Sequence, residues 1–286
     1  MKIIKYFFEF VIISFLFSIY KILGLKNSSF ISGRLSEIFG PLFRSKKIIK
    51  SNLQKAFPKI NLLEINDITK DMWNNYGRTL SEYMFLKNFR NNKLQSNIYL
   101  EGEEILEKIK NEKTPVIFVS GHFSNFELMA MQVEKSGVNL AAIYRPLNNI
   151  FLNILMERIR KKYICQNQIK KGTRGVRELL KLYKKGYSVA LMIDQRVSQG
   201  IKSKFFNKDA FTTTIPAQFV KKFNCKIVPI YIERFEGTNF KIKVEKPIIF
   251  SKDISTEKIT RDLNIWLEKM ILKNPGKWIW SHNRWK

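Results

Sequence analysis

The chain has 286 residues, with 51 Lys plus Arg against 24 Asp plus Glu, which gives a formal net charge of +27 at pH 7. Its 45% hydrophobic and 13% aromatic residues exclude a mainly disordered protein, and its two cysteines and two histidines exclude a disulfide scaffold and a His-rich metal site. The positive charge predicts an acidic partner. The candidates are nucleic acid, anionic lipid, a phosphorylated substrate and an acidic protein, and charge alone does not choose among them.

The first 25 residues, MKIIKYFFEFVIISFLFSIYKILGL, are predicted to attach the chain to a membrane. Between Tyr6 and Leu25 the only formal charges are Glu9 and Lys21, and about 20 such residues suffice for a transmembrane helix. A helix lying in the membrane interface and a buried core helix are the open alternatives. A signal peptide is disfavoured, because no small-x-small cleavage site follows the apolar run.

Positive charges after this segment predict its orientation. The positive-inside rule counts charges near the ends of a span, and Lys26, Arg34, Arg44, Lys46 and Lys47 outweigh Lys2 and Lys5. We therefore expect the body of the protein to face the cytoplasm, which agrees with the two sparse cysteines.

Residues 26–100 show helical spacing and little strand character, and are predicted to form a helical layer packed on the core. Phe30, Leu35, Ile38 and Phe39 are spaced for a helix that ends at Gly40-Pro41. Further helices are predicted over 48–57 and over 65–84. We expect the aromatic side chains of this layer to be core residues.

Residues 101–286 alternate short apolar runs with helical spacing. The predicted strands are 116–120, 140–144, 188–193, 227–232 and 240–250. The predicted helices run from residue 124 or 125 to 136 and over 150–163, 174–185, 214–223 and 256–272. This alternation predicts an α/β fold with a largely parallel sheet flanked by helices, preceded by the membrane-associated helix and the helical layer.

The segment Ser120-Gly121-His122-Phe123-Ser124-Asn125-Phe126-Glu127 holds the first candidate for catalysis. His122 follows the strand 116–120, at the edge where α/β sheets bind ligands. With His122 in a turn and Glu127 in the first helical turns, the two side chains are expected to approach each other. A carboxylate on one imidazole nitrogen fixes the tautomer and leaves the other nitrogen free as a general base. A solvated His beside a surface Glu is the alternative.

The same segment resembles the His-x-x-x-x-Glu block of the lipid A biosynthesis acyltransferases, the lauroyl and myristoyl transferase family, which is related to the glycerolipid acyltransferases. Further blocks match in order, namely Tyr144-Arg145-Pro146, Lys171-Gly172-Thr173-Arg174, Asp194-Gln195, Phe205-Phe206 before Thr212–Thr214, and the Trp-rich ending 278–286. The chain departs from the pattern at Ser124, Phe126 and Asn207, which leaves the choice of acyl chain and acceptor more open than the reaction.

This resemblance implies an acyltransferase of the inner membrane, with its catalytic domain facing the cytoplasm. It implies acyl-acyl carrier protein as donor and a phosphorylated glycolipid, the lipid A precursor, as acceptor, with no cofactor, no metal and no nucleic acid. In that reaction His122 is the general base that deprotonates the acceptor hydroxyl, and Glu127 orients it and stabilises the imidazolium.

The other blocks imply residues that bind substrate. Arg145, after the strand 140–144, can hold a phosphate or the charge on the carbonyl oxygen, and Arg174 at a helix start suits a phosphate. Asp194 and Gln195 end the strand 188–193 and are expected to face the same crevice, and Thr214 can donate a hydrogen bond. The alternatives are a surface arginine for Arg145 and caps or turn residues for Asp194 and Thr214.

Two other functions remain open. The same chemistry serves an acyltransferase whose acceptor is a phosphatidylinositol mannoside or a lysophospholipid. A basic, membrane-tethered nucleic-acid-binding protein also explains the charge, but it gives no reason for the segment 120–127. His282, in the aromatic tail, is expected to pack rather than to catalyse.

Overall fold

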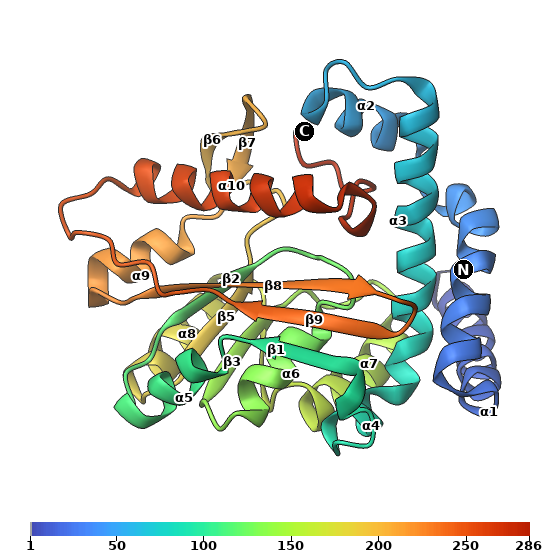
Figure 1. The fold of residues 1–286 in the computed structure, drawn as a ribbon, viewed down its shortest axis with the longest axis horizontal. Coiled ribbons are helices and arrows are strands. Elements are labelled where there is room, and N and C mark those ends of the chain that lie inside the picture. Colours follow the sequence, from blue (N-terminus) through green and yellow to red (C-terminus); the bar gives the residue numbers. More distant parts are fainter. Residues whose placement is uncertain (1) are drawn as a thin grey trace.

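The computed structural model describes residues 2–286, in which a seven-stranded sheet is flanked by helices on both faces (Figure 1). The strand order is β1-β9-β8-β2-β5-β3-β4, and only the pair β8–β9 is antiparallel. The strands are β1 (Ile98–Glu101), β2 (Ile117–Ser120), β3 (Leu140–Tyr144), β4 (Asn167–Lys170), β5 (Ser188–Met192), β8 (Ile227–Phe235) and β9 (Asn239–Val244). The predicted α/β fold with a largely parallel sheet is confirmed.

Helices cover the sheet because its central strands are apolar on both faces. In Figure 1, α6 and α7 lie below the sheet, and α9 and α10 lie above it. The helices of this part are α5 (Glu103–Glu112), α6 (Glu127–Lys135), α7 (Ile150–Tyr163), α8 (Thr173–Lys184), α9 (Ile215–Phe223) and α10 (Thr256–Lys273). All four residues of β2 are buried, as expected for a strand enclosed by two helical layers.

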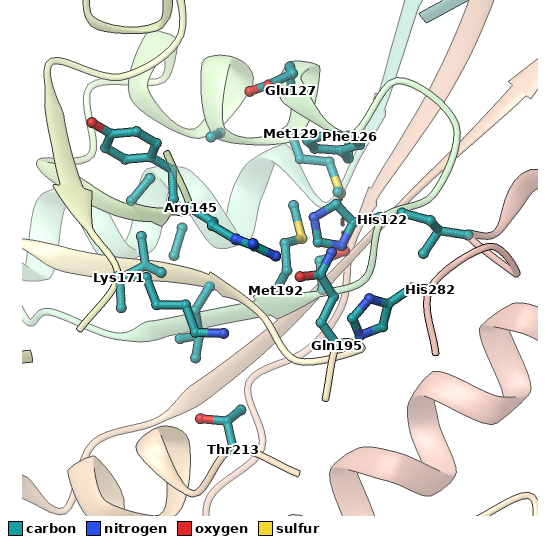
Figure 2. A pocket seen from close by; sticks show the side chains of 18 of the residues that line it. His122, Phe126, Glu127, Met129, Arg145, Lys171, Met192, Gln195, Thr213 and His282 are labelled. Carbon is teal, nitrogen blue, oxygen red and sulfur yellow. Dashed lines mark hydrogen bonds between the residues drawn. The ribbon is translucent and has the colours of Figure 1, made fainter. Parts of the chain in front are cut away.

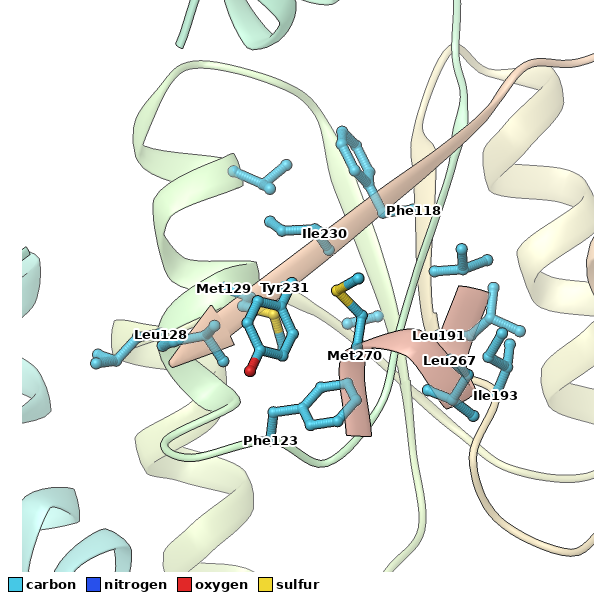
Figure 3. Packing of buried hydrophobic residues seen from close by; sticks show 14 of the residues in the cluster. Phe118, Phe123, Leu128, Met129, Leu191, Ile193, Ile230, Tyr231, Leu267 and Met270 are labelled. Atoms are coloured by element: carbon cyan, nitrogen blue, oxygen red, sulfur yellow. The ribbon is translucent and has the colours of Figure 1, made fainter. Parts of the chain in front are cut away.

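The core under α10 packs against the loop that carries His122. Phe123 is fully buried and meets Tyr231 edge to face, with ring centroids 5.0 Å apart. Figure 3 shows Leu267 and Met270 beside this pair. A side chain at Gly121 would come within 2.9 Å of Leu267 Cδ1, so the loop needs glycine to approach α10 so closely.

Several short elements, most of them polar, were not predicted from the sequence. They are β1, β4, α5 and the hairpin of β6 (Ile201–Phe205) and β7 (Lys208–Thr212). Phe206 and Asn207 turn this hairpin with φ of 49° and 58°, the paired left-handed conformation of a tight β-turn. The strand predicted over 240–250 ends early at Val244, because Pro247 lacks the amide hydrogen that a ladder needs.

The helical layer consists of α1 (Lys2–Phe43), α2 (Lys46–Ala56), α3 (Leu62–Glu82), the 3₁₀ turn η1 (Tyr83–Phe85) and α4 (Leu86–Arg90). In Figure 1 the helices α1 and α3 run beside each other across the end of the sheet to which β8 points. Gly24, with φ 75° and ψ 168°, breaks α1 into two halves. By length and composition α1 is able to cross a membrane.

The prediction that the aromatic side chains of this layer are core residues is wrong for Phe30 and Phe39 in the second half of α1, and the aliphatic side chains on the same face are exposed as well. Phe30, Leu35, Ile38 and Phe39 are 53%, 39%, 67% and 51% exposed. The helix also continues through Gly40-Pro41 to Phe43. The helical spacing was correct, but spacing gives only which residues share a face and not which face is covered.

A buried ion pair joins the helical layer to the sheet. The Arg234 guanidinium of β8 binds both carboxylate oxygens of Glu82 at the end of α3, and neither side chain is exposed by more than 4%. Ser29 of α1 donates to the same carboxylate at 3.0 Å, and Asn125 of the loop after β2 donates to it at 2.9 Å. Glu82 therefore holds α1, β8 and the His122 loop at one point.

We expect Glu82→Gln to lower the free energy of unfolding by about 3–5 kcal/mol, because it leaves the Arg234 charge buried without a counter-charge. Asp262→Asn is the matched control, since its partner Lys258 is 57% exposed and such a pair contributes less than about 1 kcal/mol. Urea unfolding followed by circular dichroism measures both losses. Equal losses in the two variants would contradict a structural role for the buried pair.

Candidate active site

The register of two neighbouring strands brings His122 and Asp194 together. Ser120 of β2 pairs with Met192 of β5, and the Ile193 amide donates to the Ser120 carbonyl at 2.8 Å. His122 and Asp194 each lie two residues beyond that pair, at the carboxyl ends of parallel strands. The His122 Nδ1 atom is 2.8 Å from Asp194 Oδ1.

Asp194 is fully buried and accepts three hydrogen bonds. Besides His122 Nδ1, the donors are the His122 backbone amide at 2.8 Å and the Trp278 indole at 2.9 Å, both to Oδ2. Burial by itself raises the pKa of this carboxyl, but the attraction of His122 and these hydrogen bonds outweigh it and lower the pKa below the usual value. An ionised Asp194 is placed to accept a hydrogen bond from Nδ1–H of His122, which lines the cavity.

Glu127 does not contact His122, so the expected pairing of these two side chains is corrected. The Glu127 carboxylate accepts hydrogen bonds from the Tyr83 hydroxyl and from Arg160 of α7, whose Nε and Nη2 lie 2.9 and 2.6 Å away. In Figure 2 the Glu127 side chain lies apart from His122 and points away from it. Asp194 occupies the position beside the imidazole that Glu127 was expected to take.

The conformation of Ser124 explains this separation. Its φ of 43° is left-handed, so the chain turns sharply between His122 and the start of α6. The turn is fixed by distant groups: Thr79 and Asn75 of α3 donate to the Ser124 carbonyl, and the Arg234 amide donates to its hydroxyl at 3.0 Å. Spacing along the motif contains no information on such contacts.

The Glu127–Arg160 pair forms a second charged group in the wall of the cavity. Burial is the largest single effect and lowers the pKa of Arg160, but the charges and hydrogen bonds of Glu127 and Tyr83 together outweigh it and raise the pKa above its usual value. Burial also raises the pKa of Tyr83, and Glu127 raises it further. Arg160 therefore stays cationic and Tyr83 neutral, and Arg160 was not among the residues predicted from the sequence.

A cavity of about 660 Å³ opens at His122 and extends between the sheet and the helices of one face. Its mouth is polar, with His122, Arg145, Lys171, Gln195 and His282 (Figure 2). Its inner wall is apolar: Phe118, Met129, Ala130, Val133, Ala142, Ile143, Ile164, Val176, Ala190, Leu191 and Ile230. The hollow exists because small side chains face each other, since Ala142 and Ala190 are register partners on adjacent strands.

The predicted substrate-binding residues divide into two groups. Asp194 lies under the mouth of the cavity, and Arg145 and Gln195 line it. Arg174 is exposed on the first turn of α8 and is not on the cavity wall. Lys171 does line the cavity, and it lies across from Arg145, because Tyr144 and Lys170 are register partners in the β3–β4 pair. Burial and the charge of Arg145 lower the pKa of Lys171.

Thr214 does not line the cavity either, whereas its neighbour Thr213 does. Its hydroxyl accepts a hydrogen bond from Gln218 of its own helix at 2.9 Å. The predicted segment does reach the cavity, but through Thr213 and not Thr214, because the side-chain direction at a helix start depends on the turn that precedes it.

His282, in the C-terminal tail, lines the mouth of the cavity. Its Nε2 accepts a hydrogen bond from the Arg196 amide at 3.1 Å. Burial lowers the pKa of His282 to about 4, so the ring is neutral near pH 7 and already has a partner on Nε2. Within residues 2–286 no group of three or more His, Cys, Asp or Glu side chains is placed to hold a metal ion.

Comparison with known proteins identifies one family. The whole chain, residues 1–286, matches the model of the bacterial lipid A biosynthesis acyltransferases. The chain is 23% identical over 254 residues to lipid A biosynthesis acyltransferase 2 of Shigella flexneri, covering 87% of this chain and 78% of that protein. It is 22% identical over 255 residues to the lipid A biosynthesis myristoyltransferase of Escherichia coli, covering 87% and 76%. With the Escherichia coli lipid A biosynthesis lauroyltransferase the identity is 23% over 251 residues, covering 85% and 79%.

The lowered pKa of His282 leads us to expect that the protein loses stability in mild acid. Its folded-state pKa of about 4 is below the usual 6.5, so the unfolded chain binds the proton first as the pH falls. The resulting stability is complete above about pH 6.5 and is lost between that pH and about 4. We expect His282→Asn, whose amide oxygen can still accept from Arg196, to make the melting temperature less dependent on pH across this range. Identical pH dependence in the variant and the parent would contradict a buried neutral imidazole.

Proposed function

Because the chain belongs to the bacterial lipid A biosynthesis acyltransferase family and is therefore an acyltransferase, we propose that it moves a fatty acyl chain from acyl-acyl carrier protein to a hydroxyl of a lipid A precursor. The observation that supports this assignment best is the His122–Asp194 pair, which leaves one imidazole nitrogen free at the mouth of an apolar cavity. A general base beside a space for a hydrocarbon chain is the arrangement that acyl transfer to an alcohol requires.

His122 acts as the general base of this reaction. Its Nε2 removes the proton from the acceptor hydroxyl, and the oxygen attacks the carbonyl carbon of the thioester. The tetrahedral intermediate then expels the carrier thiolate, which takes the proton back from His122, so that the products are an ester and a free thiol. Asp194 holds the ring in the reactive tautomer and balances the imidazolium charge between the two steps.

Cationic side chains at the cavity mouth are proposed to bind the negatively charged groups of the substrates. Arg145 and Lys171 face the mouth beside His122, where they can hold a phosphate of the acceptor or the charge that develops on the carbonyl oxygen. Arg174, exposed nearby on α8, is proposed to contact the phosphorylated headgroup outside the cavity. Glu127 acts through Arg160, because it fixes that guanidinium in the cavity wall.

The apolar part of the cavity is proposed to take the acyl chain. Its walls between the sheet and the helices α6 and α7 carry apolar side chains such as Phe118, Val133 and Ile143. Methylene groups that enter this space leave water, which favours binding by about 0.8 kcal/mol for each buried CH₂.

Membrane attachment and the charge of +27 agree with this reaction. We propose that α1 places the enzyme at the inner membrane with its catalytic part in the cytoplasm, where an acidic carrier protein and an anionic lipid are both attracted to a basic surface. In an acyltransferase the charge is explained by these two acidic substrates, without a nucleic acid as partner.

The assay that tests this proposal uses purified full-length protein, acyl carriers of several chain lengths and three acceptors. Mass spectrometry should show a new ester on a tetraacylated lipid A precursor. Acylation of a lysophospholipid or of a phosphatidylinositol mannoside, and not of the lipid A precursor, would replace the acceptor but keep the chemistry.

Substitution in the catalytic pair has an expected order of effects. We expect His122→Ala to lower kcat by at least about 10³-fold. Asp194→Asn is expected to lower it by about 10²–10⁴-fold, because an amide can stabilise the wrong imidazole tautomer. Glu127→Gln is expected to impair activity through Arg160 while leaving the His122 tautomer unchanged.

The tautomer of His122 can be measured by nitrogen–proton correlation spectra. The chain has only two histidines, so the signals that disappear in His282→Asn belong to His282 and the others to His122. The Nδ1-protonated form of His122 should persist in Glu127→Gln and be lost in Asp194→Asn. A tautomer that changes in Glu127→Gln but not in Asp194→Asn would show that Glu127, and not Asp194, orients the base.

Two adjacent alanines of β3 test the acyl cavity. Ala142 lines it, whereas Ala141 is buried on the opposite face of the strand. We expect Ala142→Val to lower kcat/KM for the longest accepted acyl chain relative to a shorter one by roughly tenfold, because added volume fills the space of the last methylenes. Ala141→Val should cost stability without changing this ratio. A shift in chain preference with Ala141→Val, or none with Ala142→Val, would place the acyl chain elsewhere.

A further inference from the structure

The outer face of the second half of α1, residues 25–43, is apolar and uncovered. Six large side chains on this face are between 38% and 78% exposed: Phe30, Ile31, Leu35, Ile38, Phe39 and Leu42. The charged side chains exposed along it are Lys26 at its start and Arg34, which pairs with Glu37 at 3.1 Å and lies over the Phe30 ring. A contiguous exposed apolar face of this kind marks a contact surface.

The inner face of the same helix half has the opposite character. Ser28, Ser29, Ser32, Gly33 and Gly40 are buried against α3. The two backbones approach so closely that a side chain at Gly77 would meet the Ser32 carbonyl oxygen at 2.0 Å. The helix thus places small and polar residues inside and large apolar residues outside. This is the reverse of a surface helix in water and matches the pattern of helices that pack in lipid.

The apolar face leads directly to the active-site cavity. The helix ends at Phe43, which is 78% exposed, and the following Arg44 and Ile48 line the cavity mouth. Arg44, Lys46 and Lys47 are all exposed here, while Glu37 is bound by Arg34 and Asn74. A cationic edge beside an apolar face is complementary to an anionic lipid surface, where each Lys or Arg adds to attraction.

We propose that the outer face of residues 25–43 lies in one leaflet of an anionic bilayer, as a second lipid contact beyond the apolar first half of α1. This contact seats the cavity mouth, through Arg44 and Ile48, at the level of the lipid headgroups. An acceptor lipid then reaches His122 without leaving the membrane. The proposal rests on the proposed function only in taking a membrane lipid as the acceptor.

A fluorescent label tests where this face lies in full-length protein. The native cysteines Cys165 and Cys225 are buried, so a polarity-sensitive thiol dye reacts with an introduced cysteine. Ile38→Cys and Leu42→Cys place the dye on the face, and Ile249→Cys is the matched control, since Ile249 is 73% exposed on the loop after β9. The protein is reconstituted with vesicles of phosphatidylethanolamine and phosphatidylglycerol.

We expect the dyes at positions 38 and 42 to shift to shorter wavelength and to be quenched by lipids that carry a nitroxide on the acyl chain. The dye at position 249 should instead be quenched by aqueous iodide. Iodide quenching at all three positions, in protein that is bound to the vesicles, would overturn the proposal. So would shielding of positions 38 and 42 in the absence of lipid that increases with protein concentration, because the covering partner would then be a second copy of the chain.

Activity gives the second measurement. Ile38→Gln with Leu42→Gln should raise KM roughly tenfold for an acceptor embedded in vesicles, about the factor for losing one buried side chain, while kcat/KM for acceptor in detergent micelles stays unchanged. The control is Ile249→Gln with Leu272→Gln, two exposed apolar residues elsewhere. Equal losses in vesicles and micelles, or an unchanged KM in vesicles, would overturn the proposal. If the parent protein acylates no lipid, the proposed function fails and the labelling result still decides the lipid contact.

Discussion

The structure of this site depends on one buried carboxylate. Asp194 follows β5, accepts both donors of His122 from the loop after β2, and accepts the indole of Trp278 from the C-terminal tail. Because a carboxylate without solvent needs hydrogen bonds on both oxygens, these contacts fix the positions of three chain segments at once. The His122 ring is thereby held in one place before any substrate binds.

Three buried carboxylates surround the His122 loop, and each has a different partner and consequence. Asp194 pairs with the imidazole, Glu127 pairs with Arg160 in the cavity wall, and Glu82 pairs with Arg234 behind the loop. The Glu127–Arg160 ion pair holds the cavity wall in place, and the Glu82–Arg234 ion pair holds the backbone behind the loop. Only the Asp194 pair includes an imidazole, whose second nitrogen can act as a base, so we propose that this pair carries the chemistry while the other two position the chain around it.

Small residues shape both the cavity and the contact between α1 and α3. Alanines at paired positions of β3 and β5 leave the space between sheet and helices that the acyl chain is proposed to fill. Glycines and serines between α1 and α3 bring two helices together and leave the large side chains of α1 outside. Between α1 and α3 even a methyl group at Gly77 would collide with the Ser32 carbonyl, whereas a larger residue at Ala142 would take space from the cavity.

The sequence by itself determined the alternating strands and helices, the parallel sheet, the family resemblance and the segment that contains His122, because these follow from local periodicity and short motifs. It also placed Arg145, Asp194 and Gln195 near the site, since the carboxyl ends of parallel strands share one edge of a sheet. Only the tertiary structure decided which carboxylate meets His122, because the order and register of β2 and β5 and the left-handed turn at Ser124 arise from contacts between distant segments. For the same reason it alone revealed Arg160 and the exposed face of α1: periodicity shows which side chains share a face, and only the packed neighbours decide whether that face is covered.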